Sequence, residues 1–253
     1  MINKRYYPYL LGVLALIFWL TLWEILARTL DLSFIFPTVL ETAEALLGLF
    51  STLAFYKNVF FSLLRVLLGF VIGLGFGCLF AILSHSHAIG RAIISPMMSV
   101  IKATPVASFI MVLWCFIGSS PVPVVIGALM VAPLIYHNLY DALQIKDREL
   151  NEVCLVYEIK GFRKFKFLYL PKLLAFLIPS TVSGIGLCWK ASIAAEIIAY
   201  TKNSIGKEIY LSKAYFEGAD LFAYTITVII LSLIFEKLMH KTGEWVKKKC
   251  HLQ

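Results

Sequence analysis

Long apolar runs separated by short polar segments dominate the chain. About six of these runs can cross a bilayer, because a membrane-spanning helix needs about 20 mostly apolar residues. The runs are continuous and do not alternate with polar residues, as the strands of a membrane β-barrel would. We therefore predict one all-α membrane domain over residues 1–253, with spans at about residues 9–27, 58–84, 92–118, 122–140, 172–200 and 219–240.

The first run and the segment after it carry further signals. Lys4 and Arg5 precede the run from Tyr9 to Ala27, which is longer than the apolar core of a signal peptide. We expect this run to be retained as the first span. Residues 38–55 place apolar side chains on one helical face and Glu41 and Glu44 on the other. This pattern predicts a helix in the membrane interface.

The composition agrees with a membrane location. The chain is 60% hydrophobic and 15% charged, with a mean hydropathy of +0.84. A soluble domain has about 25% charged residues, so in water this chain would expose large apolar patches. The net charge of +8 comes from basic residues clustered beside the spans. We therefore interpret the positive charge as a sign of the orientation of the chain in the membrane, and we expect no nucleic-acid partner. The five cysteines are scattered and predict no disulfide framework.

The basic residues also predict the orientation, because lysine and arginine concentrate in cytoplasmic segments. With the N-terminus inside, most of the 23 basic residues become cytoplasmic, in the 141–172 loop above all. The outer segments then carry only Arg28, Lys57, Lys202, Lys207 and Lys213. We predict that both termini are cytoplasmic.

A stripe of small residues marks the second span. Gly69, Gly73 and Gly77 recur every four residues and so share one helical face. Small residues allow close helix packing in membranes, so we interpret this stripe as a packing face. Ser180, Gly184 and Cys188 repeat the pattern in the fifth span.

Several ionisable residues lie within the spans, where charges are costly and often functional. Lys102 either extends to the cytoplasmic interface or lines a solute pathway. Lys190 and Glu196 either join structural interhelix pairs or contact solute. We expect Arg65 to anchor the second span at the outer headgroups. The excess of Lys102 and Lys190 over Glu196 favours an anionic solute.

The motifs of common enzymes are missing from the sequence. No G-x-x-x-x-G-K-[ST] phosphate loop is present, and Gly206-Lys207-Glu208 lacks its other residues. Neither H-E-x-x-H nor G-x-S-x-G occurs. His85 and His87 lie in a short turn without nearby acids or cysteines, and we expect no metal site there. We expect no catalytic residue in this chain.

The basic loop before the fifth predicted span carries a recognisable spacing. Glu152-Val153-Cys154 precedes Leu170-Pro171 at the distance seen in permease subunits of ABC importers, whose cytoplasmic signature is E-A-A, three residues, G, and L-P about twelve residues later. The chain resembles that family. It departs from the pattern at Val153 and Cys154, and Glu158 stands at the usual glycine, with Gly161 three residues later.

Other segments resemble the nitrate, sulfonate and taurine branch of these permeases. The similar segments, in the order of that branch, are Ser62–Phe70, Lys102–Pro105, Trp189-Lys190, Ala195-Glu196 and Ser204–Ile209. The order of the matches makes them more specific than any single one.

The resemblance implies a type I importer permease in the bacterial plasma (inner) membrane. Two copies, as a homodimer, would move solute delivered by an extracytoplasmic binding protein, while ATP and Mg²⁺ bind a separate ATPase subunit. The loop 141–171 would carry a coupling helix at 149–161 that inserts into the ATPase and ends at Gly161. Its expected coupling residues are Glu152, Val153, Cys154, Tyr157, Glu158 and Gly161. The alternative is a stand-alone secondary transporter or channel.

Overall fold

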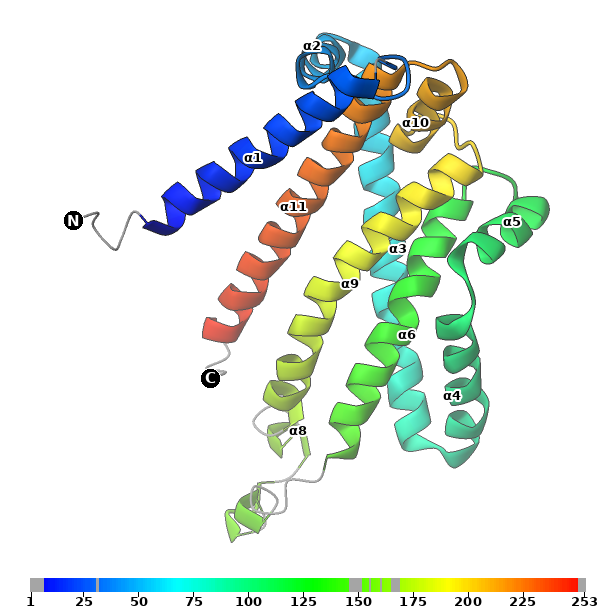
Figure 1. The fold of residues 1–253 in the computed structure, drawn as a ribbon. Helices are drawn as coiled ribbons and strands as arrows, with labels where there is room; N and C mark the ends of the chain where they lie inside the picture. The colour runs from blue at the N-terminus through cyan, green and yellow to red at the C-terminus, as the bar shows by residue number, and fades with distance from the viewer. Residues whose placement is uncertain are drawn as a thin grey trace.

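The computed structural model describes residues 7–30, 32–145, 152–154, 156–159, 161–164 and 169–249. These residues form helices and connecting turns, without strands in the described ranges, as expected for an all-α fold (Figure 1). The labelled helices are α1 (Tyr7–Leu30), α2 (Val39–Phe50), α3 (Leu53–Ser86), α4 (Ala88–Ala103), α5 (Val106–Ile117), α6 (Val122–Gln144), α8 (Gly161–Lys164), α9 (Leu170–Ile198), α10 (Ile205–Ala214) and α11 (Gly218–Lys249).

Five helices of the described chain are long and apolar enough to cross a membrane: α1, α3, α6, α9 and α11. The single span expected at 92–118 is instead broken into α4 and α5, which meet at an angle of 105°. Thr104 between them is extended, with φ −77° and ψ 133°. The ring of Pro105 disfavours a helical conformation in the residue before it. Pro105 therefore breaks the helix at Thr104, although the apolar run continues across both residues.

The close contact between α3 and α6 forms the centre of the bundle. A Cβ atom on Gly69 would lie 2.7 Å from the carbonyl oxygen of Val124, and one on Gly73 would lie 2.7 Å from that of Ala128. A Cβ atom on Gly77 would lie 2.7 Å from the Cβ atom of Ile135. The predicted stripe therefore lies directly against α6. The adjoining core from α3, α6 and α9 consists of Val66, Phe70, Val131, Ile135, Ile185, Cys188, Trp189 and Ile193.

Helix α2 is joined to the bundle by capping and by α1. Thr38 and Glu41 form a capping box, in which the Glu41 backbone N–H donates to Thr38 Oγ1 and the Thr38 N–H to Glu41 Oε2. Glu24 of α1 accepts a hydrogen bond of 3.0 Å from the Val39 backbone N–H. Little of α1 is buried, and it diverges from α11 away from this junction (Figure 1).

The α9–α11 contact completes the bundle. The rings of Trp189 and Phe235 stack with centroids 5.6 Å apart, and Trp189 Nε1 donates to the Val228 carbonyl at 3.2 Å. We call the end of the bundle near α8 the α8 end and the opposite end the α10 end (Figure 1).

Candidate functional site

The segment 152–159 projects beyond the bundle at the α8 end (Figure 1). Residues 152–154 and 156 are helical, and the Tyr157 N–H donates to the Val153 carbonyl at 3.0 Å. Val156 and Tyr157 are 78% and 73% exposed, Val153 is also exposed, and Cys154 is buried. Positions 153, 156 and 157 share one helical face. The segment therefore presents a short apolar surface outside the bundle.

This helical segment ends earlier than the sequence predicts. Glu158 is left-handed, with φ 51°, and the Ile159 N–H donates to the Cys154 carbonyl at 2.8 Å. That bond is the 6→1 bond of a Schellman ending, with Glu158 at the position usually filled by glycine. The expected helix to Gly161 is therefore wrong at its end. Gly161, with φ 60°, begins α8 instead. Residues 149–151, within the expected helix, lie outside the described residues.

A buried carboxylate joins three helices at the α10 end. Glu196 of α9 is fully buried and accepts hydrogen bonds from Ser62 Oγ at 2.7 Å, the Gly206 backbone N–H at 3.2 Å and Arg65 Nη1 at 3.2 Å. A Cβ atom on Gly206 would collide with the Glu196 side chain. The carboxylate therefore binds α3, α9 and the start of α10 together.

Arg65 completes this network from α3. It donates to the carbonyl of Lys202 at 2.8 Å and to that of Asn203 at 3.0 Å, and its side chain is only 13% exposed. The guanidinium of Arg65 is hydrogen-bonded inside the chain, and its expected place at the outer headgroups stays a prediction. Glu196, a pathway candidate, has its carboxylate oxygens engaged by the same network, which favours the structural alternative for this residue.

The two lysine candidates lie apart from that network. Lys102 is exposed in the last turn of α4, beside the break at Thr104. Lys190 is exposed on α9 and lines a pocket of about 370 Å³ against α11. None of the ion pairs found among the described residues includes either lysine. Both side chains therefore leave their charge available.

Comparison with known proteins identifies the family of this chain. Residues 73–241 match the family described as the binding-protein-dependent transport system inner membrane component. The chain belongs to this family. Two curated relatives are a Brucella melitensis protein named as an ABC transporter permease, 25% identical with 72% of this chain and 74% of the relative covered, and a Bacillus subtilis permease named for aliphatic sulfonate transport, 21% identical with 94% and 86% covered.

A solved structure has the same fold. A chain of the MetNI methionine ABC transporter, in a structure of its inward-facing conformations, matches with a TM-score of 0.52 and 17% identity. The match covers 77% of this chain and 93% of that one. Together, the family, the relatives and the fold identify the chain as a membrane-spanning permease subunit of an ABC importer in the inner membrane.

An acid of α11 lies beside Lys190 and was not among the candidates from the sequence. Glu236 of α11 lines the same pocket as Lys190. It lies within the apolar run predicted as the last span, so an ionisable residue in that run was the available signal.

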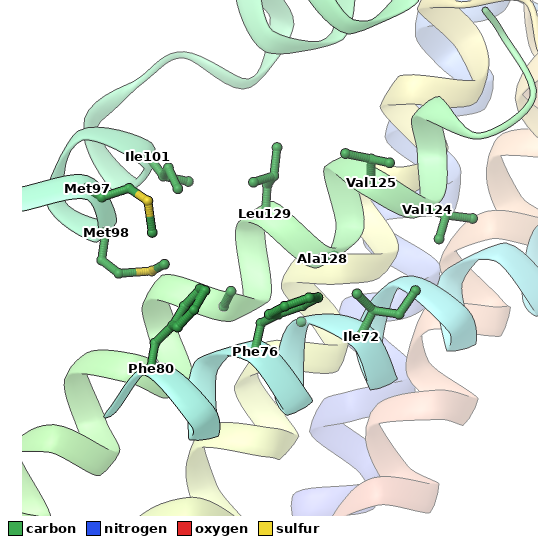
Figure 2. A pocket seen from close by; sticks show the side chains of 12 residues that line it. Ile72, Phe76, Phe80, Met97, Met98, Ile101, Val124, Val125, Ala128 and Leu129 are labelled. Atoms are coloured by element: carbon green, nitrogen blue, oxygen red, sulfur yellow. The ribbon is translucent and has the colours of Figure 1, made fainter. Parts of the chain in front are cut away.

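A second pocket of the permease lies beside the broken span. Figure 2 shows Met97, Met98 and Ile101 of α4 facing Phe76, Phe80 and Ile72 of α3, with Val124, Val125 and Leu129 of α6 closing the space. Its volume is about 410 Å³. Its side chains are apolar and offer no charge to orient a polar solute. The pocket instead leaves space next to the α4–α5 bend.

Proposed function

We propose that two copies of this permease form a homodimer around one pathway and are driven by separate ATPase subunits through the segment 152–159. An extracytoplasmic binding protein delivers a small solute, and both termini and the α8 end face the cytoplasm. ATP and Mg²⁺ bind the ATPase subunits. The observation that carries the proposal is the apolar surface of Val153, Val156 and Tyr157, exposed outside the bundle.

That surface has the properties of a docking element. Exposed apolar groups gain stability when a partner covers them and removes them from water. Glu152 is exposed at the first described residue of the helical segment, where a carboxylate can meet a cation of the partner. Cys154 is buried, in contrast to these exposed residues.

The ending at Glu158 supports transmission of motion. A hydrogen-bonded helix ending fixes the chain direction, whereas an open loop would absorb displacement of the partner. From this ending the chain passes through α8 to α9, which lies in the centre of the bundle. A push on the segment 152–159 therefore reaches the spanning helices.

The test uses the permease co-expressed with its ATPase subunit. We expect Val156→Asp to abolish co-purification of the ATPase, because a charge would be desolvated in the interface. Tyr215→Ala is the matched control, since Tyr215 is 70% exposed but lies at the α10 end. Retention of the ATPase and of full uptake by Val156→Asp would refute the proposed docking surface.

The homodimer has a separate measurement. The intact mass of the purified complex should contain two copies of this chain. A single permease copy, or a second and different permease chain, would contradict the homodimer.

A further inference from the structure

A cation and an anion face one pocket between α9 and α11. Lys190 of α9 and Glu236 of α11 line it together with Val182, Ser183, Gly186 and Leu187. Both helices are long and apolar enough to span the membrane. We call this space the α9–α11 pocket. Ionisable groups on membrane-spanning helices are costly unless they face water, a partner or a ligand.

The backbone of α9 gives the carboxylate its position. A Cβ atom on Gly186 would lie 2.6 Å from Glu236 Oε1, so any other residue at 186 would displace the carboxylate. Glu236 therefore lies directly against the α9 backbone.

The two charges do not neutralise each other in this conformation. The ion pairs within the described residues are Arg28–Glu24, Arg65–Glu196 and His240–Glu244. Neither Lys190 nor Glu236 takes part in them. Each charge therefore remains available to a group that enters the pocket.

The pocket has a continuation toward the α8 end. A neighbouring cavity of about 360 Å³ shares Val182 and Ser183 with it and is also lined by His240, Glu244 and Lys247. These last three residues lie further along α11, toward its C-terminal end. Polar side chains thus follow the α9–α11 pocket out of the membrane interior, as a route for a charged molecule requires.

We propose that the α9–α11 pocket is a solute subsite for a zwitterion, with Lys190 at the anionic group of the solute and Glu236 at its cationic group. The proposal rests on the transport function proposed above and names its solute class. A simple anion would satisfy Lys190 and leave the half-buried Glu236 beside it without a counter-charge. A zwitterion satisfies both residues at once and keeps the loaded pocket neutral.

The test measures binding to the purified permease–ATPase complex without a binding protein, using three probes of similar size. These are 3-aminopropanesulfonate, which is zwitterionic, propane-1-sulfonate, which is only anionic, and propylammonium, which is only cationic. We expect the zwitterion to bind at least roughly tenfold more tightly than either of the others, since each charged group adds a charge-assisted hydrogen bond. Glu236→Gln should remove the preference for the zwitterion over propane-1-sulfonate, and Lys190→Gln should weaken both sulfonates.

Lys237→Gln is the matched control, because it removes a charge from the residue next to Glu236 without touching the pocket lining. It should keep the preference of the wild type. Equal binding of the zwitterion and propane-1-sulfonate, or no binding of the zwitterion, would overturn the proposal. So would a loss of thermal stability in both single variants that Lys190→Glu/Glu236→Lys restores, since that result identifies a structural ion pair. ATPase co-purification in the same preparations tests the transport function separately.

Discussion

Arg65 and Glu196, 131 positions apart in the chain, form an ion pair of 3.2 Å at the α10 end. Glu196 is fully buried, and Arg65 also closes the turn at Lys202 and Asn203. Removing Arg65 leaves the Glu196 carboxylate buried with only the neutral donors Ser62 Oγ and the Gly206 N–H. The pair therefore controls how firmly α10 is held to α3 and α9.

We predict that Arg65→Met destabilises the permease by about 3 kcal/mol, the lower end of the usual cost of breaking a buried pair. Thermal unfolding in detergent measures this loss. Arg28→Met is the control, because the Arg28–Glu24 pair has its arginine side chain 75% exposed and should cost at most about 1 kcal/mol. Equal, small losses in both variants would show that the Arg65 pair contributes little.

The glycine face of α3 leads to a second prediction. Gly73→Ala should cost about 1–3 kcal/mol through overpacking, because its Cβ would lie 2.7 Å from the Ala128 carbonyl oxygen and 2.8 Å from Val131 Cβ. Gly75 has open space around it, so Gly75→Ala should leave the unfolding temperature unchanged or slightly raised. A neutral Gly73→Ala would mean that α3 and α6 separate without cost.

The left-handed residue of the segment 152–159 provides a third prediction. Glu158→Gly should be tolerated and should relieve about 1 kcal/mol of backbone strain, since Glu158 has φ 51°. Glu158→Val should disrupt the helix ending, because a β-branched residue tolerates positive φ poorly. The measurement is ATP hydrolysis stimulated by loaded binding protein in the reconstituted complex.

We expect full stimulation with glycine at 158 and reduced stimulation and uptake with valine. Gly161→Val should act in the same direction, because Gly161 also has positive φ. Glu152→Lys should reduce stimulation while sparing membrane insertion. Wild-type activity in all three disruptive variants would exclude the segment 152–159 from coupling.

The orientation of the chain gives the fourth prediction. In a background without the five native cysteines, Lys202→Cys should react with a membrane-impermeant thiol reagent in intact cells. Lys247→Cys should react only after permeabilisation, because the basic C-terminal end is expected inside. Both side chains are exposed, so access depends on sidedness. Reversed labelling would invert the proposed topology.

Local sequence properties determined much of this protein. Apolar run length decides which segments can span a bilayer, because the hydrocarbon core has a fixed thickness. This property predicted the all-α membrane fold, and the ordered motifs at 62–70, 152–158 and 204–209 indicated the permease family. Gly69, Gly73 and Gly77 share a helical face through the 3.6-residue period alone.

Two helix ends, at Thr104 and at Glu158, differ from those that the sequence predicts. Pro105 restricts Thr104, but the apolar run continues across both residues, so run length alone predicted one span. Glu158 occupies a left-handed position that propensity assigns to glycine, and for this reason the sequence predicts the helix end at Gly161 instead. In both cases backbone geometry decided the outcome.

The pairing of charges was decided by the tertiary structure. Glu196 meets Arg65 and not a residue of its own helix, and Glu236 shares a pocket with Lys190, because the packing of α3, α9 and α11 brings distant positions together. Sequence spacing relates only residues within one helix. Which intramembrane charges are bonded and which remain available for a solute therefore follows from how the helices pack.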